Sequence, residues 1–176
     1  ADPNKPDLFI HLDWMQDATH DQRLDNAAIA QVVAAFANSG YVSPTGSVGI
    51  NLHVDQGLTS TLNFTTGATW GSLSRAQSVA WQNNLGTGGG DFPYNWTQFE
   101  AIKTVNFHPT GRSPIFHYAI AANYQEPPPP GLGEDGQPVP QNTSSGISRN
   151  PVGSGFGDGA SGRNGGQAIH GLACDI

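Results

Sequence analysis

The stretch LFIHLDW at residues 8–14 decides the fold, because two kinds of side chain alternate along it. Aliphatic residues stand at positions 8, 10 and 12, while His11 and Asp13 stand at intervening positions. Successive side chains of a β-strand point to opposite faces of its sheet, so this pattern predicts a strand with one aliphatic face. The stretch VGINLHVD at residues 48–55 repeats the alternation and predicts a second strand.

The segment between these strands indicates a helix. Asp25 or Asn26 suits its N-cap, because a short polar side chain there accepts a hydrogen bond from a free backbone amide. Apolar residues recur at positions 29, 32, 33 and 36, the spacing of one helical face, and Asn-Ser-Gly at 38–40 ends the helix. Strand, crossover helix and strand place the two strands parallel. The predicted fold class is therefore α/β, with a twisted, mostly parallel sheet and crossover helices.

The rest of the chain consists of a region whose sequence patterns are less regular and a tail rich in Pro, Gly and Ser. Three further elements are predicted: a short helix over residues 72–85, a helix over 95–107 and a strand over 115–120. From residue 125 onward Pro, Gly and Ser predominate and large apolar residues are few, a composition that cannot build a core alone. We expect an α/β domain over residues 1–124 and a long irregular tail over 125–176 that packs on the same domain.

Composition narrows the range of partners and compartments. Seven basic residues stand against fourteen acidic ones, with a net charge of −7, so we expect no nucleic-acid or anionic membrane partner. No apolar run approaches the roughly 18 residues of a membrane-spanning helix. N-x-S/T sequons at Asn63, Asn95 and Asn142 predict N-linked glycans and favour a secreted, extracellular protein.

Each of the two strands carries an H-x-D triplet near its carboxyl end, His11 with Asp13 and His53 with Asp55. If the strands are neighbours in register, the four side chains meet at the sheet edge where α/β proteins tend to bind ligands. Imidazole and carboxylate groups suit zinc or another divalent metal, and the carboxylates with loop carbonyls suit calcium. The alternative is structural: hydrogen-bonded, half-buried histidines, with aspartates that cap the following turns.

Other catalytic patterns are weak. His108, His117 and His170 lack the i, i+4 spacing of paired metal ligands, no G-x-S-x-G elbow occurs, and Cys174 near the end makes a poor nucleophile. The glycine-rich residues 86–90 lack the Lys-Ser/Thr of a phosphate-binding loop. Aromatic residues between positions 70 and 96 suit either a glycan-binding face or, more commonly, a core.

Four stretches together resemble a family of secreted microbial and fungal zincin-like (metzincin-type) metalloproteases. They are DLFIHLDWM at 7–15, GINLHVDQG at 49–57, FHYAI at 116–120 and SSGIS at 144–148. The stretches recur in that order in the family, and the resemblance covers roughly residues 5–150. It implies the amino-terminal subdomain of a zincin-like fold, a zinc cofactor and a protein or peptide substrate.

The sequence departs from that family at the decisive place. The family's zinc-binding helix, H-E-L-G-H-x-L-G-L, follows S-S-G-I-S after a further strand, and neither is visible here. His170 lies near the expected position, but no Glu follows it, and the family often has an acidic residue where His11 stands. Such enzymes need metal-activated water and a carboxylate base. We therefore expect a metallopeptidase-like protein that is inactive or incomplete as a peptidase.

Two alternatives stay open. The chain is a non-catalytic secreted protein that binds a glycan or another protein through its sheet and exposed aromatic residues, in the manner of a lectin. Otherwise it is a different metal-dependent hydrolase that uses the two H-x-D pairs directly, with Asp13 or Asp55 as the base.

Overall fold

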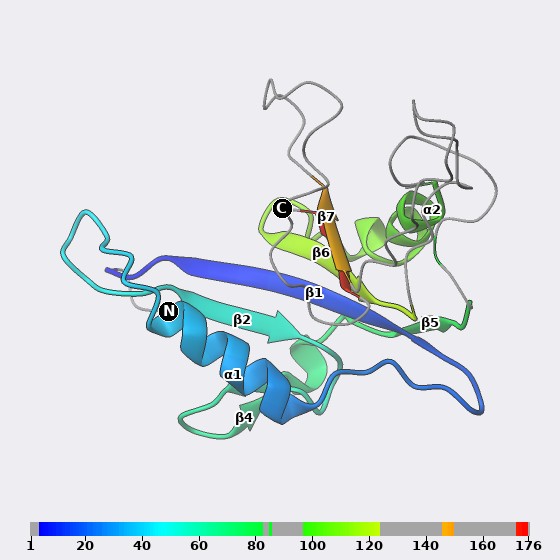
Figure 1. Cartoon of the computed structure of the whole chain (residues 1–176), viewed down its shortest axis with the longest axis horizontal. Coiled ribbons are helices and arrows are strands. Elements are labelled where there is room, and N and C mark those ends of the chain that lie inside the picture. Colours follow the sequence, from blue (N-terminus) through cyan, green and yellow to red (C-terminus); the bar gives the residue numbers. More distant parts are fainter. Residues whose placement is uncertain (1–3, 83–84, 86–96, 124–145, 150–171, 176) are drawn as a thin grey trace, which may run out of the picture.

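A computed structural model of the chain describes residues 4–82, 85, 97–123, 146–149 and 172–175. Its centre is a six-stranded sheet of order β2-β1-β6-β8-β7, with β5 also paired to β1 (Figure 1). The strands are β1 (Asp7–Gln16), β2 (Asn51–Asp55), β5 (Ser78–Ala80), β6 (Phe116–Ala121), β7 (Gly146–Arg149) and β8 (Leu172–Asp175). β1 is parallel to β2, β5 and β6, whereas β8 is antiparallel to β6 and parallel to β7. The predicted mixed α/β fold with a mostly parallel sheet is confirmed.

The first crossover helix, α1 (Asn26–Ala37), begins where the sequence predicts. The Asp25 carboxylate accepts a hydrogen bond from the amide of Ala27 at 2.9 Å, as an N-cap residue does. β2 starts later than predicted, because the chain first turns against the end of α1. Gly49 has φ +83°, and a Cβ there would lie 1.9 Å from the carbonyl oxygen of Ala37. Only glycine fits this approach.

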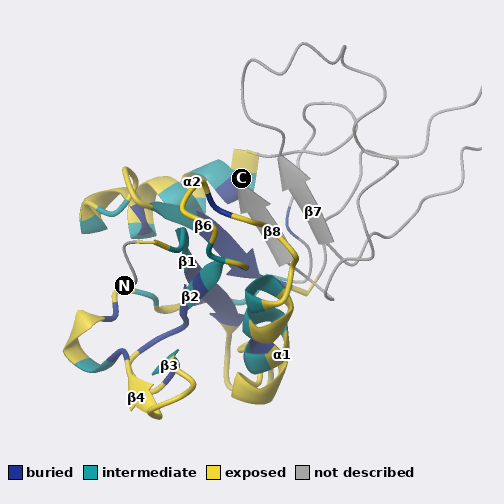
Figure 2. Cartoon of the chain, turned by 90° about the vertical axis from the view of Figure 1, so that its left-hand side faces the viewer, coloured by how far each residue is buried: buried dark blue, intermediate teal, exposed yellow. Residues whose placement is uncertain are grey.

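Two helices cover opposite faces of the sheet, as Figure 2 shows for β1, β2 and β6. Even-numbered residues of β1 and β2 pack against α1 in one apolar cluster, which includes Leu12, Trp14, Ile29, Leu52 and Val54. Odd-numbered residues face α2 (Thr97–Asn106) and join a second cluster, which includes Met15, Phe99, Phe107, Tyr118 and Ile120. The polar members of the two H-x-D triplets therefore lie on the α2 side of the sheet.

The predicted helix over residues 72–85 is wrong. That segment instead forms the short 3₁₀ helix η1 (Gly71–Leu73) and the strand β5. The reason lies in distant carboxylates: the amide of Arg75 donates to Asp55, and the amide of Gln77 donates to Asp13. Amides that donate to these carboxylates do not donate to the carbonyl of residue i−4, as an α-helix requires.

The remaining described elements are short. A hairpin of β3 (Thr61–Asn63) and β4 (Ala68–Thr69) follows β2, and η2 (His108–Thr110) follows α2. Two strands, β7 and β8, lie within the part of the chain predicted to be irregular, and both belong to the central sheet. Within the described residues, no helix has the length and apolar character needed to cross a membrane.

Candidate functional site

The pairing of β1 with β2 decides which predicted site residues meet. Its register sets His11 opposite Asp55 and Phe9 opposite His53. The two H-x-D triplets are therefore offset by two residues rather than aligned. Because a strand rises about 3.3 Å per residue, His53 lies two residues' rise along the strands from His11 and Asp55, and four from Asp13. His11, Asp13 and Asp55 are fully buried at the centre of the face.

His53 has a separate partner. Its Nε2 lies 2.7 Å from Oδ1 of Asp7, and both side chains are partly exposed. The imidazole also stacks on the ring of Phe9, with centroids 4.6 Å apart. The structure thus brings three of the four predicted metal ligands together and places the fourth in its own ion-pair arrangement near the start of β1.

Asp55 is surrounded by hydrogen-bond donors. Its carboxylate accepts from Ser74 Oγ at 2.6 Å, the Arg75 amide at 2.9 Å and the Gly57 amide at 3.1 Å. Arg112 Nη1 lies 2.5 Å from its Oδ2. Burial alone raises the pKa of Asp55, but the hydrogen bonds from Ser74, Arg75 and Arg112, with the charge of Arg112, outweigh burial and lower it. Asp55 is therefore a charged anchor for the segment after η1.

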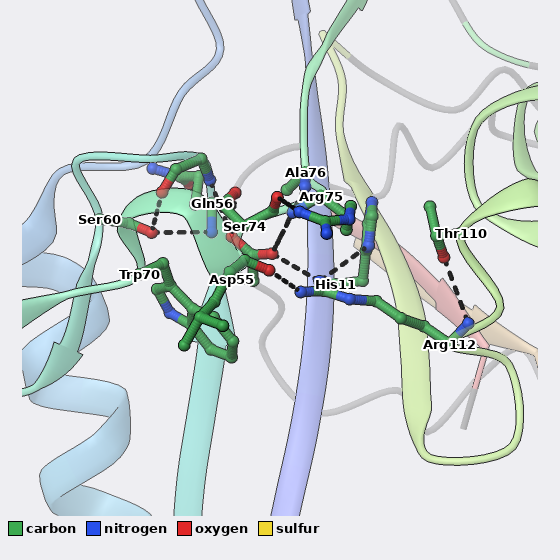
Figure 3. A network of polar contacts seen from close by, with 12 residues as sticks. His11, Asp55, Gln56, Ser60, Trp70, Ser74, Arg75, Ala76, Thr110 and Arg112 are labelled. Carbon is green, nitrogen blue, oxygen red and sulfur yellow. Dashed lines mark hydrogen bonds and ion pairs between the residues drawn. The ribbon is translucent and has the colours of Figure 1, made fainter.

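Arg112 is the residue that sequence reasoning missed. Its guanidinium lies between Asp55 and His11, as Figure 3 shows, with Nη1 also 3.4 Å from His11 Nδ1. Nη2 donates to the carbonyl oxygen of Leu73 at 2.6 Å, and the group lies 4.3 Å over the ring of Phe116. The signal that could have found it is indirect: a buried aspartate needs a cation, and the chain has only seven Lys and Arg residues.

His11 and Asp13 form a second buried contact that extends to β6. His11 Nε2 lies 2.9 Å from Asp13 Oδ1, and Tyr118 donates its hydroxyl proton to Asp13 Oδ2 at 3.0 Å. With Arg112 facing Nδ1, this arrangement assigns the imidazole proton to Nε2. Burial and then the charge of Asp13 raise the pKa of Tyr118 above its usual value, so the phenol stays protonated and keeps donating.

These five residues, His11, Asp13, Asp55, Arg112 and Tyr118, constitute what we call the buried polar network. Its carboxylates and imidazole are already engaged, and Arg112 supplies the positive charge that a metal ion would bring. The donor set therefore does not fit zinc or calcium unless Arg112 moves away. Among the described residues, no group of three or more His, Cys, Asp or Glu side chains is arranged to hold a metal ion.

The other predicted site residues are separate from the network. Asn63 is exposed at the turn of the β3–β4 hairpin, whereas Asn95 and Asn142 lie outside the described residues. Trp70 is a core residue, 5% exposed, whose indole donates to the Val54 carbonyl at 2.7 Å. Trp81 packs against the cluster on the α2 side. These two tryptophans thus serve packing, the more common alternative.

Comparison with protein-family models, curated proteins and solved structures found no match. The function of this chain is therefore inferred from its own residues and from the geometry of the buried polar network.

Proposed function

We propose that this chain is a secreted metallopeptidase-like protein that is inactive or incomplete as a peptidase. The observation that carries the proposal is where the four resembling stretches lie. They overlap β1, β2, β6 and β7, which all belong to one sheet. Segments that lie far apart in the sequence, and that resemble stretches of one family in the same order, thus form one sheet. Such a distribution is expected when the resemblance concerns a fold rather than isolated motifs.

In this proposal the buried polar network has a structural role. It joins β1, β2 and β6 to the segment after η1 and to the turn before β6, through contacts that cross the face of the sheet. A buried carboxylate that is fully hydrogen-bonded and paired with arginine restrains backbone but has no lone pair to spare for a metal or a water. His11, Asp13 and Asp55 are therefore scaffold residues.

Peptide hydrolysis by such a fold needs the two histidines and the glutamate of an H-E-x-x-H helix, and this sequence does not contain that motif. Zinc held there would polarise the peptide carbonyl and activate water. The chain's own part is to hold the sheet to which that helix would be joined. We therefore expect no peptidase activity from these 176 residues alone.

The test compares the chain with the product of its transcript read past the codon of Ile176. Both are incubated with a denatured protein substrate and zinc, with and without a chelator. An in-frame H-E-x-x-H helix, and chelator-sensitive cleavage by the longer product only, would support the proposal. Zinc-dependent cleavage by the 176-residue chain would overturn it. A transcript without the motif would leave an inactive relative, and a glycan array would then test the alternative of a binding protein.

A further inference from the structure

The segment over residues 74–80, which we call the strap, is bound to the buried polar network mainly through its backbone (Figure 3). Ser74 Oγ donates to Asp55 at 2.6 Å, and the next two amides of the chain donate to the same carboxylate at 2.9 and 3.4 Å. The amide of Gln77 donates to Asp13 at 2.9 Å. Both carboxylates are fully buried, and the strap supplies donors that a buried carboxylate requires.

The strap is joined to the sheet on one side. Among the described strands, β5 pairs with β1 alone. The Gln77 carbonyl accepts from the Trp14 amide of β1 at 3.4 Å. Backbone groups of a paired strand alternate in direction, so residue 79 also faces β1, whereas Ser78 and Ala80 direct their N–H and C=O groups away from it. Both of these outward residues are exposed.

Little apolar surface holds the strap in place. Val79 is its buried apolar side chain, 9% exposed, and belongs to the cluster on the α2 side. Ala76 packs partly buried against the cluster on the α1 side. The side chains at positions 75, 77, 78 and 80 belong to exposed residues. Segments with few buried apolar contacts are those that open at the lowest free-energy cost in a native protein.

The residues on either side of the strap are packed. Trp70, ahead of η1, is 5% exposed, and its indole donates to the Val54 carbonyl at 2.7 Å. Trp81, directly after the strap, packs against the cluster on the α2 side and stacks on His20 with centroids 4.0 Å apart. Gly71, between Trp70 and the strap, has φ +48°, a backbone conformation that glycine adopts at little cost. The strap is thus a stretch of backbone between two packed tryptophans.

We propose that the strap lifts as one unit from the carboxylates of Asp13 and Asp55, while the tryptophans at its two ends stay packed. One continuous backbone makes the bonds to both carboxylates and to β1, so these bonds break together. In the open state Asp55 keeps Arg112, and Asp13 keeps its contacts with His11 and Tyr118. The charges therefore stay paired, and the rest of the sheet need not unfold.

The consequence of opening is access. Two carboxylates that are closed to solvent become able to accept hydrogen bonds from water or from a ligand that carries donors. The strap is therefore a gate over Asp13 and Asp55. This gate follows from the contacts of the segment and does not depend on the proposed function.

The test measures the hydrogen exchange of single backbone amides by NMR, on the full chain at pH 7. The amides of Arg75, Gln77 and Val79 face the carboxylates or β1, and that of Ala119 lies in β6, which is paired on both sides. The three strap amides should have similar protection factors, at least about tenfold below that of Ala119, because lifting the strap costs less than global unfolding. Protection of the strap equal to that of Ala119 would overturn the proposal, since the strap would then open only when the sheet unfolds.

Two substitutions near opposite ends of the strap test whether it moves as a unit. Ser74→Ala removes a hydrogen bond to Asp55, and Val79→Ala removes two buried methyl groups. Each should lower the protection of all three strap amides about tenfold, as much at the far end as beside the substitution. Ser72→Ala, at an exposed residue of η1, is the matched control and should leave the protection unchanged. A loss confined to the amides beside each substitution would overturn the single unit. Circular dichroism verifies that the variants fold.

Discussion

Arg112, in the turn before β6, lies with its Nη1 2.5 Å from Oδ2 of Asp55, the last residue of β2. The two residues are 57 positions apart in the sequence. The ion pair spans β1, which lies between β2 and β6 in the sheet. It therefore ties the unit β1-α1-β2 to the turn that precedes β6, on the side of the sheet opposite α1.

Replacing Arg112 with Met should leave the Asp55 charge buried without its cation. Loss of one partner of a buried ion pair costs about 3–5 kcal/mol, and the Arg112 side chain is only 12% exposed. We expect a loss of that order in the free energy of unfolding, measured by urea denaturation at pH 7. Arg75→Met is the control, since the guanidinium of Arg75 donates to the carbonyls of Ser72 and Ser74 and, among the described residues, to no carboxylate. Equal losses in the two variants would contradict the role of Arg112.

The lowered pKa of Asp55 predicts how stability changes with pH. A carboxyl with a lower pKa in the folded state stabilises the protein at pH values above its unfolded pKa, about 3.9, and this contribution is lost as the pH falls through the folded value. The difference in unfolding free energy between wild type and Asp55→Asn should therefore be constant from about pH 5 to 7 and shrink below about pH 4. A difference that grows on acidification would contradict the ionised state of Asp55.

Tyr118→Phe should remove one donor from the buried carboxylate of Asp13. Leaving a buried acceptor short of a donor costs about 1–3 kcal/mol, and the ring itself is retained, so packing against Phe99 and Phe107 is preserved. Thermal unfolding should show a lower Tm for this variant. Tyr41→Phe, at a site 45% exposed, is the control and should leave the Tm unchanged. Similar Tm values for wild type and Tyr118→Phe would show that the hydroxyl contributes nothing.

The local parts of this fold could be predicted from sequence, because their signals lie within a few residues. Alternation gives β1 and β2, the apolar spacing gives α1, and Asp25 marks its start. The segment at 72–85 could not be predicted in this way. Its backbone amides donate to Asp55 and Asp13, which lie 20 and 64 residues away in the sequence. No periodicity within the segment indicates such distant partners.

The candidate site was only partly predictable for a related reason. Alternation correctly places His11, Asp13 and Asp55 on one face. It does not report the register, and an offset of two residues sets His11 against Asp55 and leaves His53 with Asp7. Nor does it reveal Arg112, whose turn carries no pattern that distinguishes a buried guanidinium from a solvated one.

Zinc should not bind to the buried polar network. Its carboxylates and imidazole are engaged by Arg112, Tyr118 and backbone amides, so a metal would first have to displace them. We expect elemental mass spectrometry to find no stoichiometric zinc in the purified chain, and added zinc to leave its Tm unchanged, since a ligand that binds only the folded state raises the Tm. About one equivalent of zinc, lost in both His11→Ala and His53→Ala, would restore the four-residue metal site.

Asn63 should carry an N-linked glycan when the chain passes through a eukaryotic secretory pathway. It is exposed in the hairpin turn, and its Oδ1 accepts hydrogen bonds from the amides of Thr65 and Thr66 at 2.9 and 3.0 Å. These two bonds do not engage Nδ2, the atom to which the sugar would be attached. We expect peptide mapping of the full chain, fused behind a secretory signal, to find the glycan on Asn63. Thr65→Ser keeps the sequon and should keep the glycan, whereas Thr65→Ala should lose it. An unmodified Asn63 in secreted wild-type protein would contradict the prediction, whatever the state of Asn95 and Asn142.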